Sequence, residues 1–159
     1  MFAVYNGNTY IYVSNRRGKE IITRNPRKAN IDFAKDDDVF YKKISDDELS
    51  EIFNIELWVK YSTGLPDTPF WWQVSFDGRA FVSGKVLLRF SEGFLPGWEI
   101  EENNVCVKYI DIDEITDAKV VYAYKKRNNT VYSNPRRFEE SISKDEICAV
   151  FEKFKGNNI

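Results

Sequence analysis

The sequence predicts an α+β fold that is rich in antiparallel strands. Three observations lead to this fold class. Apolar and polar residues alternate in short runs, Gly- and Asn-containing turn signals separate those runs, and one hexapeptide pattern recurs three times. The pattern reads I-[SD]-x-D-E-[LI], and its copies begin at Ile44, Ile110 and Ile142. Each copy follows strand-like runs, so the chain reads as three related units of strands with a short helix.

Eleven runs have the composition and alternation of strands. They cover residues 2–6, 9–14, 19–23, 39–43, 55–62, 69–76, 85–90, 103–109, 118–125, 130–134 and 137–141. Turn signals such as Asn6-Gly7-Asn8 separate several of them and favour antiparallel hairpins.

The recurring hexapeptide has the residues of a helix start. Its second position, which is Ser45, Asp111 or Ser143, stands three residues before a glutamate, and this is the spacing of a capping box. Apolar residues at both ends of the pattern fit the hydrophobic staple. Paired carboxylates also occur in acid–base catalysis, but the spacing favours capping, and we assign the three Asp-Glu pairs a structural role.

Helix length is expected to differ among the three copies. The first two helices are predicted to span about two turns, because strand-like alternation resumes soon after them. The third is predicted to reach Lys155, with Ile147, Val150, Phe151 and Phe154 on one apolar face.

The repeat also predicts the domain organisation. The units are expected at residues 2–53, 55–117 and 119–155, packed into a single compact domain that spans residues 1–159. They are expected to be SH3-like half-barrels in tandem or parts of one long antiparallel sheet.

The composition excludes several function classes. The chain has no histidine and only two cysteines, which removes Ser-His-Asp and Cys-His catalysis and the usual zinc sites. Neither a P-loop nor a dinucleotide fingerprint is present. We therefore expect no cofactor, no metal and no enzymatic activity. Without a long apolar run or a signal-peptide pattern, we expect a cytoplasmic protein that does not contact membranes.

Two tryptophans are candidates for partner binding. Strand alternation places Trp58 and Trp71 on the polar faces of their runs, and Tyr10 and Tyr12 have similar positions in theirs. If these faces adjoin and are open, the four rings form an aromatic surface of the kind enriched at interface hot spots. If a helix or another unit covers them, they form a second core layer.

Charge is segregated along the chain although the net charge is only −2. Residues 14–28 and 123–137 each carry a net charge of +5, which leaves −12 for the remainder. The first basic segment contains Arg16 and Arg17, and the second contains Arg136 and Arg137. The acidic remainder includes the run Asp36, Asp37 and Asp38, which would attract a basic partner.

The size, the strand-rich units and the boxes ISDDEL, IDIDEI and ISKDEI resemble the architecture of small bacterial immunity proteins. This resemblance implies a protein-binding inhibitor that occludes the active site of a toxin or nuclease. The predicted contacts are Trp58, Trp71, Asp36, Asp37 and Asp38, with the acidic residues steering toward a basic surface. A phage-encoded inhibitor of a host defence protein would have the same features.

Two other function classes stay open. In one, a small β-domain binds nucleic acid through Arg16, Arg17, Arg136 and Arg137. This hypothesis is favoured if the two basic turns that contain these arginines lie close together in the fold. In the other, a carboxylate- or tyrosine-dependent enzyme acts on a sugar or nucleotide. It would require two carboxylates outside the boxes that share a deep pocket.

Overall fold

The structure is a computed structural model that describes residues 1–16, 18–62, 69–74, 81–91, 93–102 and 104–154. Within it the chain forms two compact units. Unit 1 comprises Met1–Ile55, Tyr122–Phe138 and Glu152–Ile159, and unit 2 comprises Glu56–Val121 and Glu139–Phe151.

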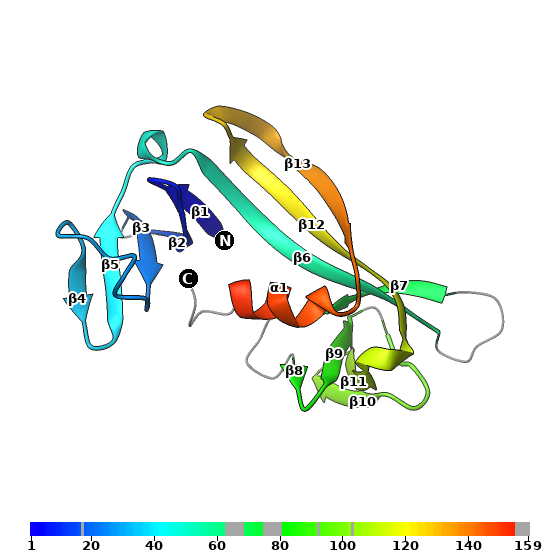
Figure 1. Ribbon diagram of the computed structural model, residues 1–159. Helices are drawn as coiled ribbons and strands as arrows, with labels where there is room; N and C mark the ends of the chain where they lie inside the picture. The colour runs from blue at the N-terminus through cyan, green and yellow to red at the C-terminus, as the bar shows by residue number, and fades with distance from the viewer. Residues whose placement is uncertain (17, 63–68, 75–80, 92, 103, 155–159) are drawn as a thin grey trace. The chain divides into compact units, whose positions relative to one another are not determined.

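Unit 1 contains an antiparallel sheet built from the first strands of the chain (Figure 1). The strands are β1 (Phe2–Tyr5), β2 (Asn8–Asn15), β3 (Gly18–Thr23), β4 (Ala34–Asp36) and β5 (Val39–Lys43). Their order is β1-β2-β3-β5-β4, and β1 also pairs with the start of β6 (Glu51–Ser62). Asn6 and Gly7 join β1 to β2 with φ values of 48° and 77°, which suit the tight hairpin turn that the Asn-Gly pair predicts.

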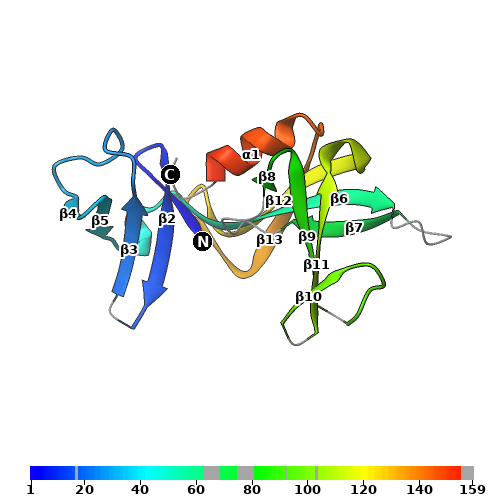
Figure 2. The same ribbon diagram turned by 90° about the horizontal axis from the view of Figure 1, so that it is seen from below.

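Unit 2 contains a second set of antiparallel strands that pair with the later part of β6. They are β7 (Pro69–Val74), β8 (Phe81–Val82), β9 (Lys85–Phe90), β10 (Glu99–Glu102) and β11 (Val105–Asp111). The order is β10-β11-β9-β7-β6, with β8 beside β9. Figure 2 shows β9 and β11 side by side, as their six-residue register requires.

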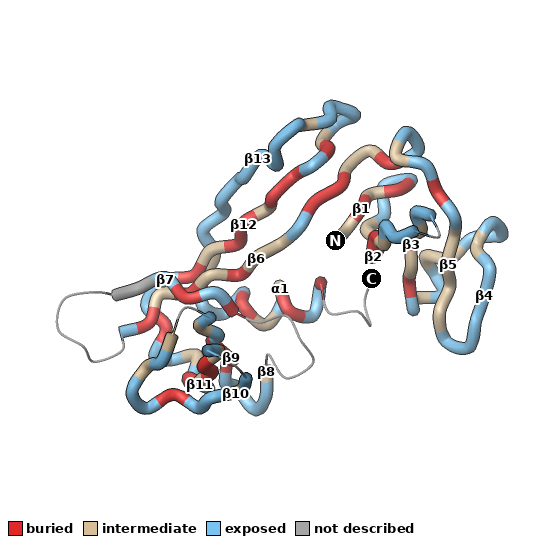
Figure 3. The backbone as a smooth tube through the Cα atoms, turned by 180° about the vertical axis from the view of Figure 1, so that it is seen from behind, coloured by how far each residue is buried: buried red, intermediate tan, exposed pale blue. Residues whose placement is uncertain are grey.

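Three long strands and the helix contribute residues to both units. Besides β6 these are β12 (Ile115–Arg127), β13 (Thr130–Ile142) and α1 (Glu146–Phe154). β12 pairs with β6 and with β13, and among the described strands β13 pairs with β12 alone. β13 therefore lies at an edge, which is where a strand tolerates the proline at position 135. Figure 3 shows β13 exposed along its length.

The first two boxes form shorter helices than the sequence predicts. They are single 3-10 turns, η1 (Asp46–Glu48) and η2 (Ile112–Glu114), and each is followed by extended backbone. The two-turn prediction is wrong because Leu49 and Ile115 leave the turn directly and lead into β6 and β12. The third box opens α1, where Ile147, Phe151 and Phe154 of the predicted apolar face are buried and Val150 is half-buried. The predicted helix end at Lys155 lies outside the described residues.

The capping chemistry of the boxes is confirmed. The glutamate in each accepts the backbone N–H of the residue three positions earlier, at 3.0 Å for Ser45, 2.9 Å for Asp111 and 2.8 Å for Ser143. In the first and third boxes this backbone hydrogen bond holds the pKa of Glu48 and of Glu146 below its ordinary value. The carboxylate pairs thus begin helical turns, as predicted.

Each unit has an aromatic core of its own. In unit 1, Phe53 lies at 5.8 Å from Phe2, 5.3 Å from Tyr124 and 6.5 Å from Phe154, measured between ring centroids. In unit 2, Trp72 packs against Trp98 at 4.9 Å. These contacts join residues far apart in sequence, so each core fixes strands that are not neighbours along the chain.

The fold is β-rich and antiparallel with one helix near its carboxyl end, as the sequence predicts. The division into three SH3-like units is not confirmed. Within the described residues, no helix combines the length and apolar character that crossing a membrane requires.

Candidate functional site

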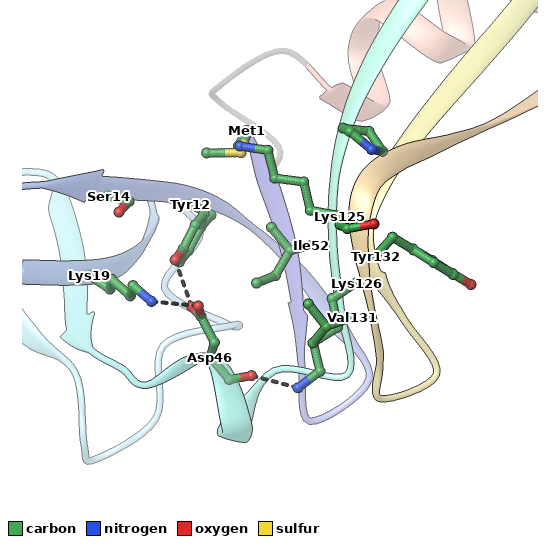
Figure 4. Close-up of a pocket in the computed structure, with 12 residues that line it drawn as sticks. Met1, Tyr12, Ser14, Lys19, Asp46, Ile52, Lys125, Lys126, Val131 and Tyr132 are labelled. Atoms are coloured by element: carbon green, nitrogen blue, oxygen red, sulfur yellow. Dashed lines mark hydrogen bonds and ion pairs between the residues drawn. The ribbon is translucent and has the colours of Figure 1, made fainter.

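A basic pocket lies within unit 1, and both basic segments of the chain line it. Its volume is about 340 Å³. Residues from β2, β3, η1, β6, β12 and β13 surround it, with Met1 at one side: Met1, Tyr12, Ser14, Lys19, Asp46, Ile52, Lys125, Lys126, Val131, Tyr132, Ser133 and Pro135. Figure 4 shows these side chains. Residues of the basic segments 14–28 and 123–137 therefore lie together at this pocket.

Asp46 is the centre of the polar network in this basic pocket. Its carboxylate accepts a hydrogen bond from the Tyr12 hydroxyl at 2.7 Å and pairs with the Lys19 ammonium. The Lys126 ammonium donates to the Asp46 backbone carbonyl at 2.6 Å. In Figure 4 the three donors point toward Asp46 from different strands. This network ties η1 to β2, β3 and β12.

The network shifts two ionisation equilibria. Burial, together with the hydrogen bond to Asp46, raises the pKa of Tyr12 to about 12, so its hydroxyl stays protonated as a donor. Burial by itself would raise the pKa of Asp46, but hydrogen bonds from Lys19 and Tyr12 outweigh it and hold that pKa below its ordinary value. Asp46 is thus a carboxylate at neutral pH.

Lys126 of the basic pocket is buried, which the sequence analysis does not predict. It is only 5% exposed, although lysine is almost never buried to this extent unless it is paired. A signal was present, because Lys126 continues the alternation of the apolar run VVYAY by one more inward position. In the sequence it contributes to the +5 charge of residues 123–137 and carries no other signal of burial.

The structure describes three of the four predicted arginines. Arg16 lies in the exposed turn after β2, and Arg17 lies outside the described residues. Arg136 and Arg137 are exposed on β13, where the Arg136 guanidinium lies 5.3 Å from the Tyr132 ring. Arg16, Arg136 and Arg137 do not line the basic pocket, whose described side-chain cations are lysines.

Trp58 and Trp71 do lie on the same sheet face, in unit 2. Trp58 pairs with Gln73 and Lys60 pairs with Trp71 across the β6–β7 ladder, so the two indoles are diagonal neighbours. Trp58 is half-buried and donates from Nε1 to Glu56 at 2.8 Å, whereas Trp71 is 38% exposed. We call this surface, formed by Trp58, Lys60, Trp71, Gln73 and Lys119, the Trp71 face.

Tyr10 and Tyr12 do not extend that surface. Both are buried in unit 1, because the aromatic side of β2 is its core side. Burial is possible since each hydroxyl finds an acceptor: Tyr10 donates to the Lys28 carbonyl at 3.0 Å, and Tyr12 donates to Asp46. Of the two alternatives for the four rings, the tyrosines therefore follow the second and belong to the core.

Asp36, Asp37 and Asp38 lie at the exposed turn between β4 and β5. With Glu20, Ile22, Val39 and Tyr41 they line an open depression of about 490 Å³ in unit 1. Asp37 adopts a positive φ of 50°, and Arg24 lies 3.7 Å from Asp38. The three aspartates are solvent-exposed, so this open depression differs from the deep pocket that acid–base catalysis would require.

Metal and thiol chemistry find little support among the described residues. No group of three or more His, Cys, Asp or Glu side chains there could hold a metal ion. Cys106 is buried and Cys148 is half-buried, and both are free thiols. Cys106 donates from Sγ to the Gly93 carbonyl at 3.3 Å, which suits the structural role that its apolar surroundings predict.

Residues 1–64 match a family model described as "Uncharacterised conserved protein UCP033725". This match covers β1 to β6 and therefore includes the box at Ser45, Asp46 with its partners Tyr12 and Lys19, and Trp58, whereas Lys126 lies outside it. Neither the curated proteins nor the solved structures contain a significant match. The chain is thus similar over its amino-terminal part to a family without an assigned activity.

Proposed function

We propose that this protein is a protein-binding inhibitor of the immunity type, which occludes a functional surface of its partner. The observation that carries the proposal is the Trp71 face. Two tryptophans from neighbouring strands lie together there, and one of them is open to solvent. Tryptophan is the residue type most enriched at the energetic centres of protein interfaces.

Charged side chains surround the exposed indole. The Lys119 ammonium lies 4.6 Å from the Trp71 ring centroid and 2.8 Å from Glu139. Lys60, the cross-strand neighbour of Trp71, lies 3.4 Å from Asp117. An aromatic centre with a polar rim is the usual anatomy of a protein interface, because the rim shields the central contacts from water.

The acidic turn of unit 1 supplies the second part of the proposal. Asp36, Asp37 and Asp38 project into solvent and create a local negative potential that would accelerate encounter with a basic partner, such as a nuclease-like toxin. In this proposal they act mainly on the association rate, and the Trp71 face acts on the lifetime of the complex.

The finer expectations belong to the same proposal. In this proposal the protein is cytoplasmic, of bacterial or phage origin, and has no cofactor, metal or catalytic activity. These properties suit an inhibitor that is made in the compartment where its target acts. The three capped boxes would then belong to the scaffold, since their glutamates are occupied with helix capping, and recognition would depend on other surfaces.

The test is affinity capture from the native host with three baits: the wild-type protein, Trp71→Ala and Tyr109→Ala. Tyr109 is the matched control, because it is an aromatic residue of unit 2 with 39% exposure that lies outside the Trp71 face. We expect a toxin-like protein that binds the wild type and Tyr109→Ala but not Trp71→Ala, and whose activity the wild type inhibits. Recovery of RNA without a protein would contradict the proposal.

A further inference from the structure

We infer that the basic pocket of unit 1 binds the phosphate group of a nucleotide, either free or at the end of a strand. This inference concerns a ligand and a pocket that the inhibitor proposal does not use, since that proposal depends on the Trp71 face of unit 2 and on the acidic turn elsewhere in unit 1. A buried cation, the charge balance of the pocket and its apolar wall support it.

Lys126 supplies the buried cation. An ammonium has three N–H donors, and within the described chain the bond to the Asp46 carbonyl uses one of them. The side chain lines the pocket while only 5% of the residue is exposed. Because a buried charge is costly unless its donors are matched, an anion in the cavity would stabilise this group.

The charge balance of the pocket is positive. Lys19, Lys125 and Lys126 line it against one carboxylate, that of Asp46. Lys19 and Tyr12 already occupy that carboxylate, which reduces its repulsion of an incoming anion. Lys125 is exposed and has no ion pair with another described residue. Lys125 and Lys126 therefore remain available for a doubly charged phosphate monoester.

Shape and lining favour a nucleotide over inorganic phosphate. A cavity of about 340 Å³ is larger than a phosphate ion needs and lies within the usual range for small-molecule sites. Ile52, Val131 and Pro135 give it an apolar wall, and Val131 is 73% exposed. A base or ribose packed on that wall would cover it, while Ser14 and Ser133 offer hydroxyls to the sugar. Tyr132 projects away from the Asp46 network, so we assign it no stacking role (Figure 4).

Titration calorimetry on the full chain tests this inference. The probes are AMP, adenosine, inorganic phosphate and a single-stranded oligonucleotide with a terminal phosphate. We expect AMP to bind, adenosine to bind at least about tenfold more weakly, and affinity to fall as salt rises. If the oligonucleotide binds more tightly than AMP, the strand end is the natural source of the phosphate. If AMP binds more tightly than the oligonucleotide, the free nucleotide is the natural source of the phosphate.

Three variants assign the binding to the pocket. Lys125→Gln and Lys126→Gln should each weaken AMP binding about tenfold, the loss expected for one charge-assisted hydrogen bond. Lys43→Gln removes an exposed charge of unit 1 outside the pocket and should leave it unchanged. Lys125→Gln keeps the test decisive if the buried Lys126 variant fails to fold. Binding of neither AMP nor the oligonucleotide, equal binding of adenosine, or an equal loss in all three variants would overturn the inference.

Discussion

Asp46 belongs to a capping segment, yet its side chain does more than begin a turn. Ser45 and Glu48 complete the capping box beside it, which leaves the Asp46 carboxylate to accept from Tyr12 and to pair with Lys19. The carboxylate is partly solvated, so solvent screens the pair and limits what it contributes. Its hydrogen bonds nevertheless give the fold a dependence on pH.

We expect Asp46→Asn to lower the free energy of unfolding by about 1 kcal/mol at neutral pH. The folded state holds the pKa of Asp46 below its ordinary value. Its contribution is therefore present above about pH 4, the pKa of an unfolded aspartate, and is lost as the pH falls through the folded pKa. Urea unfolding at a series of pH values should show that the free energy of unfolding falls less on acidification for Asp46→Asn than for the wild type.

Asp47→Asn is the control for this titration. Asp47 is exposed in the same turn and has neither Tyr12 nor Lys19 as a partner. If the free energy of unfolding of Asp46→Asn and of Asp47→Asn changes equally between neutral and acidic pH, the Asp46 network contributes nothing measurable to stability.

At the scale of elements, the residue after each 3-10 turn fixes the turn to the core. Leu49 ends η1 and is fully buried. We expect Leu49→Ala to cost about 2–5 kcal/mol, because it leaves a cavity where the chain enters β6. Ile31→Ala, at a position that is 99% exposed in the same unit, should change stability by less than about 0.5 kcal/mol. Thermal unfolding of both variants measures the difference, and similar melting temperatures would contradict this role.

The edge strand β13 carries features that oppose sheet-to-sheet association. Pro135 removes a backbone donor, and the charged residues Arg136, Arg137, Glu139 and Glu140 follow it on the strand. We expect Pro135→Thr to self-associate more than the wild type as the protein concentration is raised, which light scattering would detect. Ser133→Thr, on the same strand, should self-associate no more than the wild type. Unchanged monodispersity of Pro135→Thr would show that the proline has no protective effect.

Sequence reasoning predicted elements best where one local signal decided them. The bounds of β5 and β9 agree with the predicted runs 39–43 and 85–90. The capping bonds join residues three positions apart, as the box pattern predicts. It missed β4, β8 and β10, which are short strands held by pairing partners rather than by their own composition. It also divided β13 at Pro135, because a proline argues against a strand interior unless the strand is known to lie at an edge.

The candidate site was less predictable for a related reason. Alternation placed Trp58 and Trp71 on one face but could not show which side of β2 faces the core, since both sides of that strand carry bulky residues. The burial of Tyr12 and Lys126 depends on Asp46, which lies 34 and 80 positions away in the sequence. Partners at such separations leave no local pattern.

At the scale of the molecule, neither unit is a continuous stretch of chain. The chain passes between the units within β6, β12, β13 and α1, so unit 1 requires residues 122–138 as well as the amino-terminal strands. We expect a fragment of residues 1–64 to remain largely unfolded, because it lacks Lys126 and two of the aromatic residues that contact Phe53, Tyr124 and Phe154. Circular dichroism with a thermal scan measures this, and cooperative melting of the fragment would contradict the division into units.

The central claim is that the Trp71 face carries the binding energy for a partner protein. The most direct measurement is the affinity of the captured partner for the wild type, Trp71→Ala and Tyr109→Ala. We predict a loss of at least about 2 kcal/mol for Trp71→Ala, as for a hot-spot tryptophan, with parallel loss of inhibition and little change for Tyr109→Ala. Equal affinities for all three proteins would contradict the claim.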